Sequence, residues 1–108
     1  MKYVLFFIFV LFPMVTYSEA WIDSPYVTIN KVYPSDGGLA FYPDYKDATV
    51  SACDSGSRFV IPLTDVNYNV KASVLLAAFM AGKKVLLRYD TDQVKACSAV
   101  VNRFIVDN

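Results

Sequence analysis

One segment near the middle of the chain, VKASVLLAAFMAG (residues 70–82), constrains the fold most strongly. It is rich in Ala, Leu and Met, which favour helices, and it contains no proline. Asn69 is a suitable N-cap residue, and Asp65 and Asn67 are alternatives. Gly82 fits the left-handed position that commonly follows a helix. The sequence therefore predicts one α-helix that ends just before Gly82.

The segments around this helix have the composition of short strands. They are rich in β-branched and aromatic residues, and Pro, Gly and Asp separate them. One further stretch, TVSAC (49–53), could be a strand of its own. The five expected strands are 26–34, 39–43, 58–63, 84–90 and 97–106.

The resulting order is β-β-β-α-β-β, which is typical of a small five-stranded OB-type barrel. Cystatin-like and ferredoxin-like sheets fit less well, because they place their helices elsewhere in the order. We therefore expect a mainly β fold with one helix, built as an OB-type barrel.

The expected helix is apolar on all sides, since Ser73 is the only polar residue between Ala72 and Ala81. A helix that covers a small barrel normally has one apolar stripe and one polar face. Two interpretations remain open: the helix is deeply embedded in its own domain, or its second face packs against another chain. For the second case the candidate oligomer-interface residues are Val74, Leu76 and Met80.

The first 20 residues have the pattern of a secretory signal. Lys2 precedes the apolar run YVLFFIFVLFPMV, and small residues at Ser18 and Ala20 suit a signal peptidase. A membrane anchor is the alternative, but the run is shorter than the ~20 apolar residues of a span and Pro13 interrupts it. We expect a signal peptide over 1–20, a single OB-like domain over 21–108, and an exported protein that is periplasmic or secreted.

The net charge of the chain is zero, and loss of residues 1–20 would remove one Lys and one Glu and leave it unchanged. A neutral protein has no general attraction to phosphate backbones or anionic lipid. Nucleic acid and stable membrane insertion after cleavage are therefore not expected.

The chain has two cysteines, Cys53 and Cys97, and no histidine. In an oxidising compartment two thiols of a small domain usually pair. A Cys53–Cys97 bridge would stabilise the fold by about 4 kcal/mol on chain-entropy reasoning. Two cysteines without histidine make a poor metal site, and the usual general base is absent. We therefore expect a disulfide, no metal, no cofactor and no enzymatic activity.

Ser51-Ala52-Cys53 precedes the expected helix, and Gly82 and Val85 open the strand after it. In these features, and in its first hairpin, the chain over about residues 24–90 resembles the B subunits of subtilase cytotoxin and related pertussis-like AB5 toxins. Those subunits are longer and have additional cysteines. The resemblance implies an OB-type barrel in a homo-oligomeric ring of five, which binds cell-surface glycans without catalysis and carries a secreted partner chain.

The sugar site of these toxin subunits combines serine, acidic and aromatic residues near the first strands. The positions here that resemble this pattern are Ser24, Tyr26 and Asp44. Independently, many tyrosines and Trp21 lie beside short polar residues, as at Asp44 and Lys46, and such mixed linings suit small-molecule sites. Tyrosine is also common in half-buried strands, so a structural role is the alternative.

Two functions remain open from the sequence. The first is a secreted, oligomeric, glycan-binding subunit. The second is a periplasmic or secreted protein-interaction module, such as an inhibitor or a stand-alone structural protein, with no sugar site.

Overall fold

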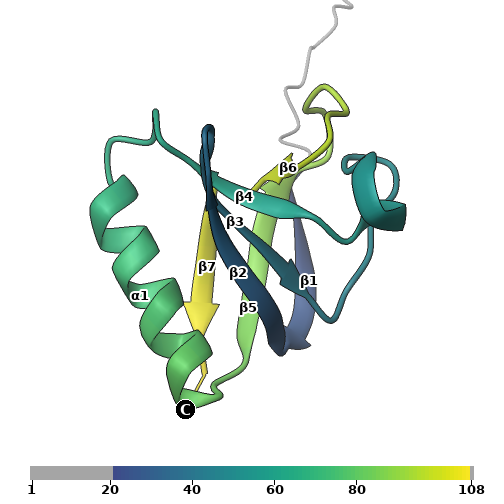
Figure 1. Cartoon of the computed structure of the whole chain (residues 1–108). Helices are drawn as coiled ribbons and strands as arrows, with labels where there is room; N and C mark the ends of the chain where they lie inside the picture. Colours follow the sequence, from purple (N-terminus) through teal and green to yellow (C-terminus); the bar gives the residue numbers. More distant parts are fainter. Residues whose placement is uncertain (1–20, 108) are drawn as a thin grey trace, which may run out of the picture.

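The computed structural model describes residues 21–107, and the expected signal peptide (1–20) lies outside the described residues. The described chain is mainly β with one α-helix (Figure 1). Its elements are β1 (Trp21–Val27), β2 (Ile29–Ser35), β3 (Gly38–Pro43), the short 3-10 segment η1 (Cys53–Gly56), β4 (Phe59–Pro62), α1 (Tyr68–Ala81), β5 (Val85–Asp90), β6 (Ala99–Val100) and β7 (Arg103–Val106).

The strands form two sheets, with the orders β1-β5-β7 and β2-β3-β4-β6. All pairs are antiparallel except β4 and β6, which run parallel. The expectation of one closed five-stranded barrel is therefore corrected: seven strands are present among residues 21–107, and the two sheets are not closed into a barrel. The segment 49–53 forms no strand, and only Ser51 makes an isolated bridge to Ala96.

The larger number of strands has a local cause. The expected first strand starts earlier and divides at Thr28, so that β1 joins one sheet and β2 the other. Within β1 the register shifts between Asp23 and Tyr26, because Pro25 has no N–H to donate to the ladder. The expected last strand divides in the same way between β6 and β7.

The buried side chains of both sheets and of α1 form one cluster. β5 shows the alternation clearly, because Val85, Leu87 and Tyr89 are buried while the residues between them are partly exposed. From α1 only Leu75 and Ala78 are buried. The other main members of the core are Val27, Ile29, Leu39, Phe41, Val50, Phe59, Ile61, Ala99 and Val101.

The predicted limits of α1 are close to those observed. Asn67, one of the three alternatives, is the N-cap residue, and Gly82 ends the helix in the left-handed conformation with φ 69°. None of the helices within residues 21–107 has the length and apolar character needed to cross a membrane.

The predicted disulfide is confirmed. Cys53 and Cys97 are bonded, with their Cα atoms 4.6 Å apart, and no free cysteine is present among the described residues. The bridge ties η1 to the loop before β6, on the side of the molecule away from α1 (Figure 1).

Candidate functional site

The three residues expected to form a sugar site do not lie together. Ser24 is only 2% exposed, and its Oγ donates to the Pro25 carbonyl and accepts the Leu87 N–H at 2.9 Å. The Ser24 hydroxyl thus accepts a backbone N–H of β5 where the register of β1 shifts, in place of a backbone carbonyl. Tyr26 is exposed on the other face of the same sheet, opposite Leu86.

Asp44 follows β3 and lines a different pocket, which we call the tyrosine cleft. This pocket has a volume of about 360 Å³. Its lining combines two phenol rings, two ammonium groups, an amide, a carboxylate and a hydroxyl. The lining residues are Asn30, Lys31, Tyr42, Pro43, Asp44, Tyr45, Lys46 and Ser57.

Tyr42 is fixed in this cleft by charged neighbours. Its hydroxyl donates to Asp54 Oδ2 at 2.8 Å and accepts from Arg58 Nε at 3.0 Å, and Arg58 also pairs with Asp54 at 3.2 Å. The bond to Asp54 raises the pKa of Tyr42 and, in return, lowers the pKa of Asp54. The rings of Tyr33 and Tyr42 stack at 6.2 Å, with the Arg58 guanidinium 5.6 Å from each.

Tyr45 is fixed by a second network that reaches the core. The hydroxyl of buried Tyr89 donates to Asp47 Oδ2, so the Tyr45 hydroxyl is the donor in its 2.7 Å bond to Tyr89. Burial and the bond to Asp47 raise the pKa of Tyr89. Burial opposes the charged form of Asp47, but bonds from Thr49 and Tyr89 outweigh it and lower the pKa of Asp47. Asp47 is therefore an ionised acceptor at neutral pH.

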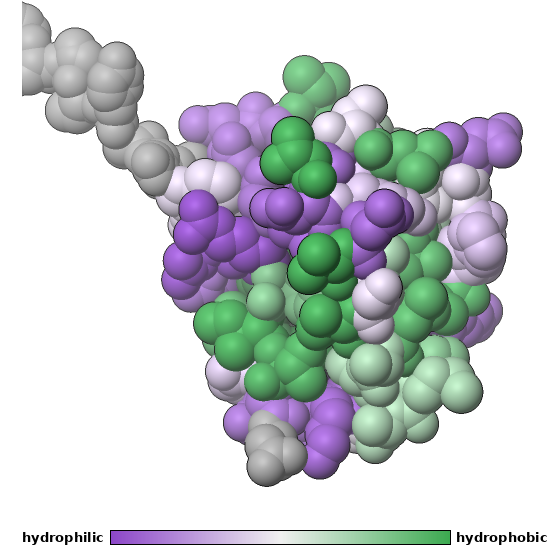
Figure 2. Space-filling model, turned by 90° about the vertical axis from the view of Figure 1, so that its left-hand side faces the viewer, coloured by the Kyte–Doolittle hydropathy of each residue, from purple (hydrophilic) through white to green (hydrophobic). Residues whose placement is uncertain are grey.

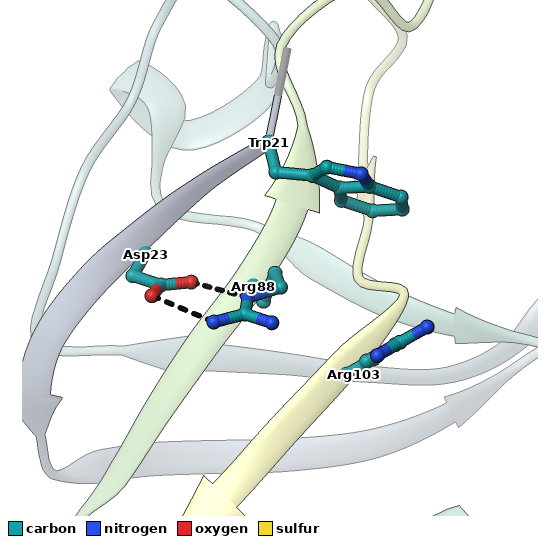
Figure 3. A pocket seen from close by; sticks show the side chains of 4 residues that line it. All are labelled: Trp21, Asp23, Arg88 and Arg103. Carbon is teal, nitrogen blue, oxygen red and sulfur yellow. Dashed lines mark hydrogen bonds and ion pairs between the residues drawn. The ribbon is translucent and has the colours of Figure 1, made fainter. Parts of the chain in front are cut away.

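A second pocket, about 470 Å³ in volume, lies on the other sheet (Figure 3). Its lining residues are Trp21 and Asp23 of β1, Arg88 of β5 and Arg103 of β7, and we call it the Trp21 pocket. Arg88 donates from Nε to Asp23 Oδ1 at 2.6 Å and from Nη2 to Asp23 Oδ2 at 3.0 Å. This bond lowers the pKa of Asp23 and raises that of Arg88.

The three expected interface residues are all exposed. Val74, Leu76 and Met80 lie on the outward half of α1, and Met80 is 80% exposed. Figure 2 faces the side of the molecule that α1 covers and shows hydrophobic side chains gathered there. The exposed residues of α1, which we call the α1 outer face, are Asn69, Val70, Ser73, Val74, Leu76, Ala77, Met80 and Ala81.

Sequence reasoning did not single out Arg88 and Arg103. The alternation within 84–90 and 103–106 indicates that both side chains point outward. Only the observed register, with Arg88 opposite Arg103, brings them together.

Comparison with protein-family models finds none that matches this sequence, and neither the curated proteins nor the solved structures give a significant match. The resemblance to AB5 toxin B subunits stays a prediction.

Proposed function

We propose that this chain is an exported, non-enzymatic, carbohydrate-binding subunit that uses the tyrosine cleft as its sugar site. The observation that carries the proposal is that Asp44, singled out from the sequence, lies in one pocket with Tyr42 and Tyr45. Aromatic faces stack on the apolar face of a pyranose, while the carboxylate, amide and ammonium groups bind its hydroxyls.

The rigidity of the two tyrosines supports this role. Each hydroxyl is hydrogen-bonded to groups outside the lining, Tyr42 to Asp54 and Tyr45 to Tyr89. Their rings are therefore held in place before a ligand arrives. Preorganised contacts reduce the entropy lost on binding.

The strand pairings support an OB-type interpretation. Suppose β1 with β2, and β6 with β7, each count as one bent strand. The pairs then run in a circle, from β1/β2 through β3, β4, β6/β7 and β5 back to β1/β2. OB folds bind oligosaccharides on the face of their second and third strands, which correspond here to β3 and β4. Tyr42 belongs to β3, and Arg58 directly precedes β4.

The compartment part of the proposal draws on two features. One is the signal-like sequence of residues 1–20. The other is the Cys53–Cys97 disulfide, since disulfides persist mainly in oxidising compartments.

A glycan array probed with the exported protein tests the sugar site. We expect selective retention of a glycan, and Asp44→Ala should weaken it about 10-fold, since one lost hydrogen-bonded contact is worth about 1.4 kcal/mol. Asp36→Ala is the matched control, because Asp36 is also exposed but lies in the turn between β2 and β3. Absence of any retained glycan, or equal affinities of the two variants, would overturn the proposal.

The α1 outer face supports the oligomeric part of the proposal and also the alternative, a protein-interaction module without a sugar site. Six of its eight residues are apolar, and contiguous exposed apolar surface commonly marks a partner site. We propose a second copy of the chain as the partner, in a ring such as the pentamer of the resembled toxins, with a secreted partner chain docking on the ring.

Native mass measurement tests this assembly. We expect an oligomer for the exported protein and a monomer for Leu76→Asp. Val94→Asp is the control, because Val94 is 87% exposed but lies in the loop before β6. A monomeric unmodified protein that still retains a glycan would remove the ring and leave the sugar site intact.

A further inference from the structure

The Trp21 pocket contains a pair of like charges that the tyrosine-cleft proposal does not use. Arg88 of β5 and Arg103 of β7 are direct cross-strand partners on the outer face of their sheet. Like charges directly opposite each other destabilise a sheet. Asp23 of β1, the cross-strand partner of Arg88 on its other side, compensates only one of them.

The charges of the pocket do not balance. Two guanidinium groups and one carboxylate leave one positive charge. Both oxygens of Asp23 are bound to Arg88, and within residues 21–107 no ion pair or hydrogen bond engages the guanidinium of Arg103. Figure 3 shows Arg103 on the neighbouring strand, directed away from the Asp23–Arg88 pair. One monovalent anion would balance the pocket.

An aromatic surface lies beside this unbalanced charge. Trp21 lines the same pocket, and the side chain is 40% exposed. In Figure 3 the indole ring and the Arg103 side chain extend toward the same side of the sheet. An indole face accepts the apolar side of a ring or a hydrocarbon group.

We propose that the Trp21 pocket is a binding site for a carboxylate carried on a ring or apolar group. Arg103 holds the carboxylate through its planar fork of donors, which matches two carboxylate oxygens. Arg88 adds positive charge while Asp23 keeps it in position, and Trp21 packs against the group that carries the carboxylate. A dianion such as phosphate fits less well, because the excess charge is single and Asp23 repels further negative charge.

The carboxylate has two possible sources, an acidic sugar or the free terminus of a peptide. Both present the same planar monoanion to Arg103. The Trp21 pocket lies on a different sheet from the tyrosine cleft. A negative binding result at one site therefore does not count against the other.

Titration of the full chain, followed by calorimetry or by the fluorescence of Trp21, the single tryptophan, tests the proposal. The probes are glucuronate, glucose, N-acetylphenylalanine and inorganic phosphate. We expect glucuronate or N-acetylphenylalanine to bind at least 10-fold more tightly than glucose and phosphate. Tighter binding of glucuronate would identify an acidic sugar as the source of the carboxylate, and tighter binding of N-acetylphenylalanine would identify a peptide terminus. Binding should weaken as salt is added.

Arg103→Gln should weaken carboxylate binding at least 10-fold while thermal stability is unchanged or higher, since the substitution removes one of two like charges at paired strand positions. Arg103→Lys, which keeps the charge without the fork, should give an intermediate affinity. Lys95→Gln, an exposed cation outside the pocket, should bind as the unmodified chain does, and so should Asp44→Ala. Equal binding of glucose and glucuronate, unchanged affinity of Arg103→Gln, or a marked loss of its stability would overturn the proposal.

Discussion

The segment 44–58 and the helix α1 lie on opposite sides of the molecule (Figure 1). In each of them the observed packing is the reverse of what its composition suggests. The segment 44–58 is polar and has no regular secondary structure apart from η1, yet many bonds fix it. From Ala72 to Ala81 the helix has one polar side chain, Ser73, yet only two side chains of the whole helix are buried.

The polar segment is held by several kinds of bond. The Asp47 N–H donates to the Gly56 carbonyl at 2.9 Å, and the Ala52 N–H donates to the Ala96 carbonyl at 2.7 Å. Gly56 has a positive φ, and a Cβ there would lie 2.7 Å from the Ala48 nitrogen, so only glycine fits. The Cys53–Cys97 disulfide adds a covalent link.

The helix has fewer ties to the rest of the chain. Leu75 and Ala78 pack into the core. Near its start, Lys71 Nζ donates to Asp65 Oδ2 and to the Asn102 carbonyl, each at 2.6 Å. Local order in this protein therefore follows from satisfied polar groups and covalent links, whereas apolar composition leads to burial only where a facing surface is available.

Removal of the disulfide tests how much the fixed conformation of segment 44–58 depends on this covalent link. The double variant Cys53→Ser, Cys97→Ser should lower the free energy of unfolding by about 4 kcal/mol, because the unfolded chain regains the entropy of a long loop. Urea unfolding gives this value. Hydrogen exchange should show larger losses of protection at Ala52 and Cys53 than in α1. A change below about 1 kcal/mol would mean that the hydrogen bonds alone fix the segment.

Two truncations on α1 test whether burial, not composition, sets the contribution of its side chains. Leu75→Ala should cost about 3 kcal/mol, because it leaves a cavity in the core. Met80→Ala should change the stability of the isolated monomer by less than about 0.5 kcal/mol. Denaturant unfolding at low protein concentration measures both. Similar losses for the two variants would contradict the observed orientation of the helix.

A third prediction concerns Asp47, whose replacement should cost less than the loss of the disulfide or of the Leu75 side chain. Asp47→Asn should lower stability at neutral pH by about 1–2 kcal/mol, since it weakens the bonds from Tyr89 and Thr49. The pKa of Asp47 is lower in the folded chain than in the unfolded one, so the unfolded state takes up the proton first as the pH falls. The stabilisation is therefore complete above about pH 4 and is lost as the pH falls through the folded pKa.

Urea unfolding of both proteins across this pH range checks the prediction. The difference in stability between them should shrink toward acid pH. A constant difference would show that Asp47 acts through shape and not through charge.

Sequence patterns predicted the main local elements because their causes are local. The helix ending at Gly82, the turn between β2 and β3, and most strand positions follow from residue type and period. The Cys53–Cys97 pairing followed from there being two cysteines in a chain expected to be exported. Asp44, a candidate sugar-binding residue from the sequence, lines the tyrosine cleft, whereas Ser24 and Tyr26 lie elsewhere, and its role in binding stays a prediction.

The tertiary structure decided what depends on residues distant in sequence. The division of the first strand at Thr28 and the seven-stranded, two-sheet arrangement depend on which partner each half finds. The pairing of Arg88 with Arg103 and the networks around Tyr42 and Tyr45 join segments that no local pattern relates. Residue type and period determine local conformation, but a pocket depends on register and sheet order, which are fixed only when the whole core packs.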